Sequence, residues 1–176
     1  NYLKIKKGLE IHYQGDLQKN SGLVTSASYC VKLLNSIKSL HNINTSSLNL
    51  ALSAIHIEQN LMKENSGSQD QIWASYGGFN SIEFNNKDKF KVKKIPLTKS
   101  KVNKLNCNLF LIYTGIHKYS HIIEGDKMLN FQKNINFLDQ IHLLAKEFKS
   151  TITNNNDLDF IGDLLNEYWF LKKKLS

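Results

Sequence analysis

Apolar residues recur at steps of three and four positions in several stretches of this chain, which is the spacing of one face of an amphipathic helix. The first stretch runs from Ala27 through Val31 and Leu34 to Leu40 and follows a polar turn at residues 21–26. We therefore predict a helix that begins at this turn.

A second helix is predicted to begin at Thr45-Ser46-Ser47, because hydroxyl side chains accept hydrogen bonds from the first free N–H groups of a helix. Its apolar spacing continues to Met62, and we expect it to end near residues 65–67. A short helix at residues 71–76 is expected to stop at Gly77-Gly78, since glycine commonly follows the last turn of a helix.

The C-terminal part of the chain is also predicted to be helical. Residues 126–149 can hold one long helix or two, and residues 158–175 predict another. The stripe of this last helix consists of Leu158, Ile161, Leu164, Leu165, Tyr168 and Trp169.

Three short segments predict strands. Residues 9–13 alternate apolar and polar side chains, as a half-buried strand does; residues 79–84 follow the double glycine; and residues 109–113 form a continuous apolar run typical of a buried strand. The lysine-rich residues 99–108 are interpreted as a connection between two halves. Because strands and helices fall into two clusters rather than a strict alternation, the predicted fold class is α+β.

Composition and charge narrow the functional classes. The chain has 176 residues, of which 41% are hydrophobic and 22% charged, as in an ordinary globular protein. It contains no run of about 18 apolar residues, and residues 1–7 lack the apolar core of a signal peptide. We expect a cytoplasmic protein without a membrane partner.

The formal net charge of +8 suggests a nucleic-acid partner, but every basic residue is lysine. Arginine provides the planar fork that suits base and phosphate recognition, whereas lysine often only solvates a surface. We therefore expect no nucleic acid as a partner. Cys30 and Cys107 lack metal-site spacing and are expected to be buried free thiols.

The polar turn Ser21-Gly22-Leu23-Val24-Thr25-Ser26 precedes a predicted helix, where unpaired backbone N–H groups and the helix dipole attract anions. The hydroxyls of Thr25 and Ser26 can bond phosphate oxygens or ligate magnesium. The turn is not a P-loop of the Walker type, because the Gly-Lys-Ser/Thr ending is missing. Ordinary helix capping explains the same residues.

Two carboxylates stand out further along the chain. Glu58 lies on the same predicted stripe as Ala51, Ile55 and Met62, where a charge must be paired, ligate a metal or border a cleft. A pairing with a lysine at the rim is the alternative. Asp70 lies in a small polar loop before the short helix; it could cap that helix, or it could orient a substrate hydroxyl for phosphoryl transfer.

Taken together, these segments resemble the GHMP kinases, and among them the heptose 7-phosphate kinases. The residues Gly22-Leu23-Val24-Thr25-Ser26 resemble the family's Gly-Leu-Gly-Ser-Ser phosphate motif. The block Ile55-His56-Ile57-Glu58-Gln59-Asn60, followed by Gly67-Ser68-Gln69-Asp70-Gln71 and Tyr76-Gly77-Gly78-Phe79-Asn80, is the more specific match. The segments 111–115 and 167–169 resemble later parts of the same kinases.

The resemblance implies a separate role for each of these residues. Asp70 would be the catalytic base, Ser26 and Glu58 would hold Mg²⁺, and residues Ser21, Gly22, Leu23, Val24, Thr25 and Ser26 would cradle the phosphates of ATP. The substrate would be a small sugar or sugar phosphate. The implied fold has an N-terminal lobe like the second domain of ribosomal protein S5, here residues 1–98, and a ferredoxin-like C-terminal lobe, here residues 99–176.

The chain also departs from the family pattern. The N-terminal sugar-binding motif, expected before Leu9, and the C-terminal glycine-rich motif, expected after Ser176, are not among these residues, so the fold is expected to be incomplete at both ends. Val24 replaces the second glycine of the phosphate motif, and its branched side chain restricts the backbone there. The alternative is therefore a degenerate relative that binds sugar or nucleotide without turnover.

Overall fold

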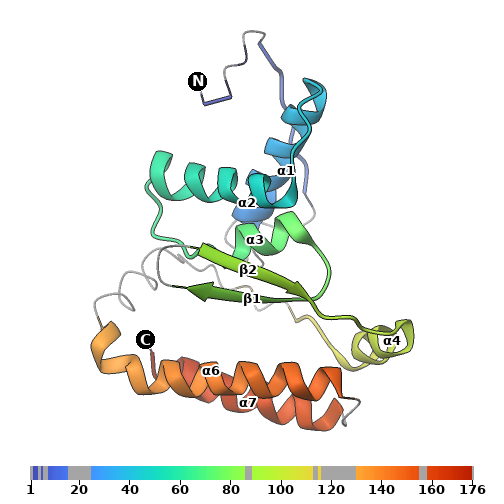
Figure 1. Ribbon diagram of the computed structural model, residues 1–176, viewed down its shortest axis with the longest axis vertical. Helices are drawn as coiled ribbons and strands as arrows, with labels where there is room; N and C mark the ends of the chain where they lie inside the picture. Colours follow the sequence, from blue (N-terminus) through green and yellow to red (C-terminus); the bar gives the residue numbers. More distant parts are fainter. Residues whose placement is uncertain are drawn as a thin grey trace.

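A computed structural model of the chain describes residues 2–3, 5, 8–15, 25–85, 89–112, 115, 130–154 and 158–175. In chain order the elements are α1 (Thr25–Leu40), α2 (Ser47–Ile55), the π-helix η1 (His56–Leu61), α3 (Gln69–Tyr76), β1 (Asn80–Asn85), β2 (Lys89–Lys94), α4 (Lys99–Asn108), α6 (Phe131–Thr153) and α7 (Leu158–Lys173). Figure 1 shows the two strands between a group formed by α1, α2 and α3 and the pair α6 and α7. This mixture of helices and a small sheet agrees with the predicted α+β class.

The helices α1, α2 and α3 pack around one small apolar core. Val31 and Leu34 of α1 contact Leu50 and Ala54 of α2, and all four side chains are buried. Ala54 has no exposed surface, so its small side chain lets the helices approach closely. The predicted cap of α2 is confirmed, because the hydroxyl of Ser46 accepts a hydrogen bond from the N–H of Asn49 at 3.2 Å. The sequence pattern thus correctly predicts this group of helices.

The strands β1 and β2 form an antiparallel hairpin directly after α3. Ile82 pairs with Val92, and Phe84 pairs with Phe90, in the register of the hairpin. Cross-strand pairs of apolar and aromatic residues stabilise such a ladder. The prediction of a strand at residues 79–84 is confirmed by β1, whereas β2 was not predicted, because its alternating lysines make it look like a charged surface segment.

The helices α6 and α7 lie side by side and contact each other through Leu144, Leu164 and Leu171. A second cluster joins this pair to the segment after the hairpin, because Ile95 packs with Ile152 and Ile161. One long helix at residues 131–153 resolves the alternative of one helix or two for the described part of that region. Among the described helices, none is long and apolar enough to cross a membrane.

Three predictions of local structure are wrong. Residues 9–13 form no strand; Leu9, Ile11 and Tyr13 are 40 to 64% exposed, and the ring of Tyr13 packs edge-on against Tyr29 of α1 instead. The described part of the apolar run, residues 109–112, is not a strand either and is exposed. Neither segment has a partner strand within the described part of the chain, and a strand needs one to satisfy its backbone groups.

The lysine-rich segment 99–108 is helix α4 rather than an irregular connection. Its start is fixed by Thr98, whose hydroxyl accepts a hydrogen bond from the N–H of Lys101 at 3.3 Å. The ammonium group of Lys101 in turn donates to the carbonyl oxygen of Ile152 at the end of α6. Cys107, in the last turn of α4, is exposed and Cys30 is only partly buried, so the expectation of two buried thiols is wrong for Cys107 and only partly met by Cys30.

Candidate functional site

The π-helix η1 follows α2 directly and determines where the side chains of residues 56–61 point. In η1 the N–H of Met62 donates to the carbonyl oxygen of Ile57, five residues earlier, at 2.9 Å. The wider turn rotates the following side chains relative to an α-helix, and such segments are frequent at functional sites. Glu58 is 3% exposed, as its place on the apolar stripe predicts, whereas Met62, at the end of the π-helix, is 59% exposed. The predicted stripe is correct for Glu58 and wrong for Met62.

The buried carboxylate of Glu58 has a side-chain partner on α3. Gln71, which is 1% exposed, donates a hydrogen bond from Nε2 to Oε2 of Glu58. The other amide atom, Gln71 Oε1, is buried and has no hydrogen-bond partner within the described part of the chain. The expected alternative of a rim pairing between Glu58 and a lysine is therefore wrong, since Glu58 is buried and bonded to an amide.

Three effects determine the pKa of Glu58. Burial raises it most strongly, the hydrogen bond from Gln71 lowers it, and the negative charges of Glu64 and Asp70 raise it again. Burial raises the pKa because the charged form loses hydration, and nearby negative charge acts in the same direction. A cation beside Glu58 would reverse both unfavourable effects. Asp70 lies near Glu58, because it directly precedes Gln71, whose amide bonds the carboxylate of Glu58.

Asp70 lies in the first turn of α3, one residue before Gln71, and is partly exposed. Ser68 is the N-cap residue of α3, so Asp70 does not occupy the cap position that the alternative interpretation gave it. A negative charge in the first turn is favoured by the helix dipole. The preceding loop is held in place by Gln59, which donates to the carbonyl oxygen of Ser66 at 2.8 Å and to the hydroxyl of Ser68 at 3.2 Å.

The predicted phosphate turn is only partly described. Ser21, Gly22, Leu23 and Val24 lie outside the described residues; Thr25 and Ser26 form the first turn of α1, where Thr25 is partly buried and Ser26 is exposed.

The thiol of Cys30, in α1, has a raised pKa. Burial raises the pKa of its thiol to about 11, with further contributions from the charges of Glu58 and Glu64. Ser26 lies four residues before Cys30 and so shares its helix face.

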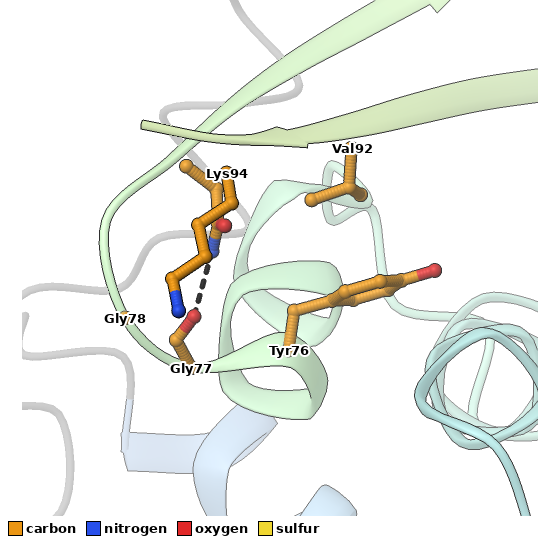
Figure 2. Close-up of a pocket in the computed structure, with 6 residues that line it drawn as sticks. Tyr76, Gly77, Gly78, Val92 and Lys94 are labelled. Carbon is orange, nitrogen blue, oxygen red and sulfur yellow. Dashed lines mark hydrogen bonds between the residues drawn. The ribbon is translucent and has the colours of Figure 1, made fainter. Parts of the chain in front are cut away.

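A hollow lies at the opposite end of α3. It has a volume of about 370 Å³ and is lined by Tyr76, Gly77, Gly78, Asn80, Val92 and Lys94. Figure 2 shows the side chain of Lys94 extending towards the double-glycine turn, which is closed by a hydrogen bond of 2.7 Å from Asn80 Nδ2 to the carbonyl oxygen of Gly77. Both glycines have positive φ angles, 60° and 72°. Asp70 is about 10 Å away along the helix axis, at 1.5 Å per residue, so the hollow does not include it.

The carboxylates suit a magnesium ion only in part. Within the described residues, no three His, Cys, Asp or Glu side chains are grouped so that they could hold a metal. Mg²⁺, however, is commonly bound by one or two carboxylates together with water and substrate phosphates. Glu58, with the unpaired amide oxygen of Gln71 beside it, fits such a partial ligand set.

Comparison with known proteins bears on these carboxylates. Residues 1–78 match the family profile described as the GHMP kinases N terminal domain. The chain is related to the GHMP kinases. The matched range contains the turn at residues 21–26, Glu58 and Asp70, so the residues on which the resemblance depends lie inside it.

Two curated relatives of this GHMP kinase homologue are sugar kinases by name. It is 25% identical over 178 residues to the D-glycero-alpha-D-manno-heptose 7-phosphate kinase of Campylobacter jejuni, covering 100% of this chain and 52% of that protein. It is also 25% identical over 175 residues to the bifunctional fucokinase/GDP-fucose pyrophosphorylase of Arabidopsis thaliana, covering 96% of this chain and 16% of that protein. The chain thus spans about half of the first relative and a smaller part of the second.

Sequence reasoning missed one residue of the site. Gln71 lies in the motif around Asp70, but nothing in the sequence singles it out, because a glutamine beside a polar loop is usually exposed. The apolar spacing predicts the inward position of Glu58, but only the packing of α3 against α2 makes Gln71 its buried neighbour. No pattern of apolar spacing indicates this contact in advance.

Proposed function

We propose that this protein contributes to the ATP-dependent phosphorylation of a hydroxyl group on a sugar or sugar phosphate. The best candidate is D-glycero-D-manno-heptose 7-phosphate, converted to the 1,7-bisphosphate, because a heptose 7-phosphate kinase is among the relatives. The observation that carries the proposal is the electrostatic proximity of two differently placed carboxylates, the buried Glu58 and the partly exposed Asp70.

In this proposal Asp70 acts on the acceptor substrate. Its partly exposed carboxylate at the start of α3 accepts a hydrogen bond from the sugar hydroxyl and orients its oxygen towards the γ-phosphate of ATP. It takes up the hydroxyl proton as the new O–P bond forms and the bond from the γ-phosphorus to the bridging oxygen breaks, which releases ADP. Positioning of this kind supplies much of the rate gain in phosphoryl transfer.

The opposite half of the site binds the nucleotide. Residues 21–26, at the N-terminal end of α1, offer backbone N–H groups and hydroxyls to the phosphates of ATP. Glu58 and Ser26 hold the Mg²⁺ ion, which when bound neutralises charge on the transferred phosphoryl group. The packing of α1 against α2 and α3, the helices next to Glu58 and carrying Asp70, supports this arrangement.

We further propose that residues 1–98 belong to the N-terminal lobe of a two-lobed kinase and residues 99–176 to its C-terminal lobe. The N-terminal group of helices with its own core supports this division. The cluster of Ile95, Ile152 and Ile161 crosses the proposed boundary and would form part of the contact between the lobes. The S5-like and ferredoxin-like architectures remain part of this proposal.

The test is an ADP-release assay on the full-length gene product with Mg·ATP and a panel of sugars and sugar phosphates that includes heptose 7-phosphate. We expect sugar-dependent ADP release above the rate without a sugar. Isothermal titration with Mg·ATP runs alongside it. If the nucleotide binds without turnover on any sugar, the degenerate binding protein replaces the kinase; if neither binding nor turnover occurs, both interpretations are wrong.

A further inference from the structure

We propose that Gln71 is a positioning residue for the magnesium site: its amide nitrogen fixes the carboxylate of Glu58, and its unpaired amide oxygen receives a hydrogen bond from the hydrated cation. This inference rests on the proposed function, because it assigns a role within the same site. It names a residue that neither the motif analysis nor the family comparison singles out.

The orientation of the Gln71 amide follows from the chemistry of its partner. An ionised carboxylate only accepts hydrogen bonds, so the NH₂ group of Gln71, and not its oxygen, must face Oε2 of Glu58. The amide oxygen is thereby turned away from Glu58. With both side chains at most 3% exposed, neither rotates freely to exchange these roles.

The unpaired oxygen indicates a ligand rather than a purely structural role. Buried amide groups in folded proteins nearly always have their hydrogen bonds satisfied, and exceptions require an explanation. Gln71 Oε1 is buried without a partner in the described part of the chain. If Gln71 only filled space between α2 and α3, a methionine would do so without an unpaired atom.

The oxygen is also of the right kind for this ligand. Mg²⁺ keeps several of its water molecules in proteins, and those waters are strong hydrogen-bond donors. Residues that hold a metal ligand in orientation are themselves important for affinity. Because Asp70 and Gln71 are consecutive in α3, the same helical turn would set both the proposed base and the residue that orients the metal ligand.

Gln71→Met tests the proposal, since methionine keeps the length of the side chain and removes both polar atoms. The measurement is the affinity for Mn²⁺, followed by the electron paramagnetic resonance signal of the free ion, in the full-length protein with the non-hydrolysable ATP analogue AMP-PNP. We expect a loss of about 10- to 100-fold. Gln69→Met is the matched control, because Gln69 lies in the same helix and is exposed; we expect it to bind as the wild type does.

A double-mutant cycle separates positioning from general disturbance of the fold. Because Gln71 acts through Glu58, adding Gln71→Met to Glu58→Gln should cause little further loss of Mn²⁺ affinity. Should Gln71→Met not fold, Gln71→Asn serves instead: it keeps an amide but is one methylene too short for both contacts, and the same loss is expected.

The outcomes distinguish this inference from the proposed function. If the wild type binds Mn²⁺ and releases ADP but Gln71→Met and Gln71→Asn match Gln69→Met, the role of Gln71 is refuted and the kinase stands. Full, additive losses in the double mutant also refute positioning through Glu58. If the wild type binds no Mn²⁺ with AMP-PNP, the metal site itself is wrong, and the inference fails with it.

Discussion

Replacing Glu58 by glutamine should stabilise the protein without ligand and remove its response to metal and nucleotide. The change keeps the shape of the side chain and an oxygen that can accept the hydrogen bond from Gln71. It removes a buried charge whose pKa is raised first by burial and then by Glu64 and Asp70. Active sites commonly retain such unfavourable groups at a cost in stability.

The dependence on pH follows from the direction of this shift. A carboxyl whose pKa is higher in the folded chain than in the unfolded chain binds more protons when folded. The wild type therefore loses stability as the pH rises from 4.5, the ordinary pKa of a glutamate, through the raised pKa of Glu58. The advantage of Glu58→Gln should therefore be absent below pH 4.5, grow through this window and level off above it. An advantage that stays constant with pH would contradict the reasoning.

The expected size of the stabilisation by ligand follows from its concentration relative to Kd. Mg²⁺ with AMP-PNP at about 100 times Kd should stabilise the wild type by about 2.7 kcal/mol. For a chain of this length this corresponds to a rise in Tm of about 5 to 10 °C.

Thermal unfolding followed by circular dichroism, with and without ligand, is the assay. Glu58→Gln should show a higher Tm without ligand and almost no rise with it, whereas the control Glu64→Gln, at an exposed position, should keep most of the response. A lower Tm of Glu58→Gln without ligand at every pH would show that the carboxylate holds the fold together, and would refute the account.

Three further predictions concern the thiols, the helical core and the phosphate turn. At pH 8 a thiol reagent should modify the exposed Cys107 quickly and the partly buried Cys30 slowly, because the pKa of Cys30 is raised to about 11. Equal rates, read by mass spectrometry, would contradict the partial burial of Cys30. Ile72→Ala should lower the free energy of unfolding in urea by about 2 to 5 kcal/mol, since Ile72 has no exposed surface; a loss no larger than that of Leu48→Ala, at a 43% exposed position, would argue against this core. Val24→Gly should raise the affinity for Mg·ATP in calorimetry if valine crowds the phosphates, and an unchanged affinity would remove that explanation.

The helices α1, α2 and α3 were predictable from their own sequences, whereas α4 was not. Apolar spacing identifies α1 and α2, a hydroxyl cap marks the start of α2, and Gly77, with a φ of 60°, ends α3 where glycine was expected to end it. The hairpin was only half predictable. β1 follows the double glycine as expected, but β2 alternates lysine with apolar residues and is recognisable only once its pairing with β1 is known.

The candidate site was predictable as a set of residue types but not as an arrangement. Spacing indicated that Glu58 faces inward, and the structure agrees. The partnership with Gln71 depends on the packing of α3 against α2, which is a tertiary effect. The segments 9–13 and 109–112 show the converse, since local alternation or apolarity alone does not supply the partner strand that a sheet requires.

The central claim is that Asp70 accepts the proton of the sugar hydroxyl during phosphoryl transfer. The most direct measurement compares Asp70→Asn with the wild type in sugar-dependent ADP release, with the affinity for Mg·ATP determined on the same samples. Glu64→Gln is the control, because it removes a nearby exposed carboxylate. The account predicts that Asp70→Asn loses about 10²- to 10⁴-fold in turnover and keeps its nucleotide affinity. Turnover that is unchanged in Asp70→Asn would contradict it.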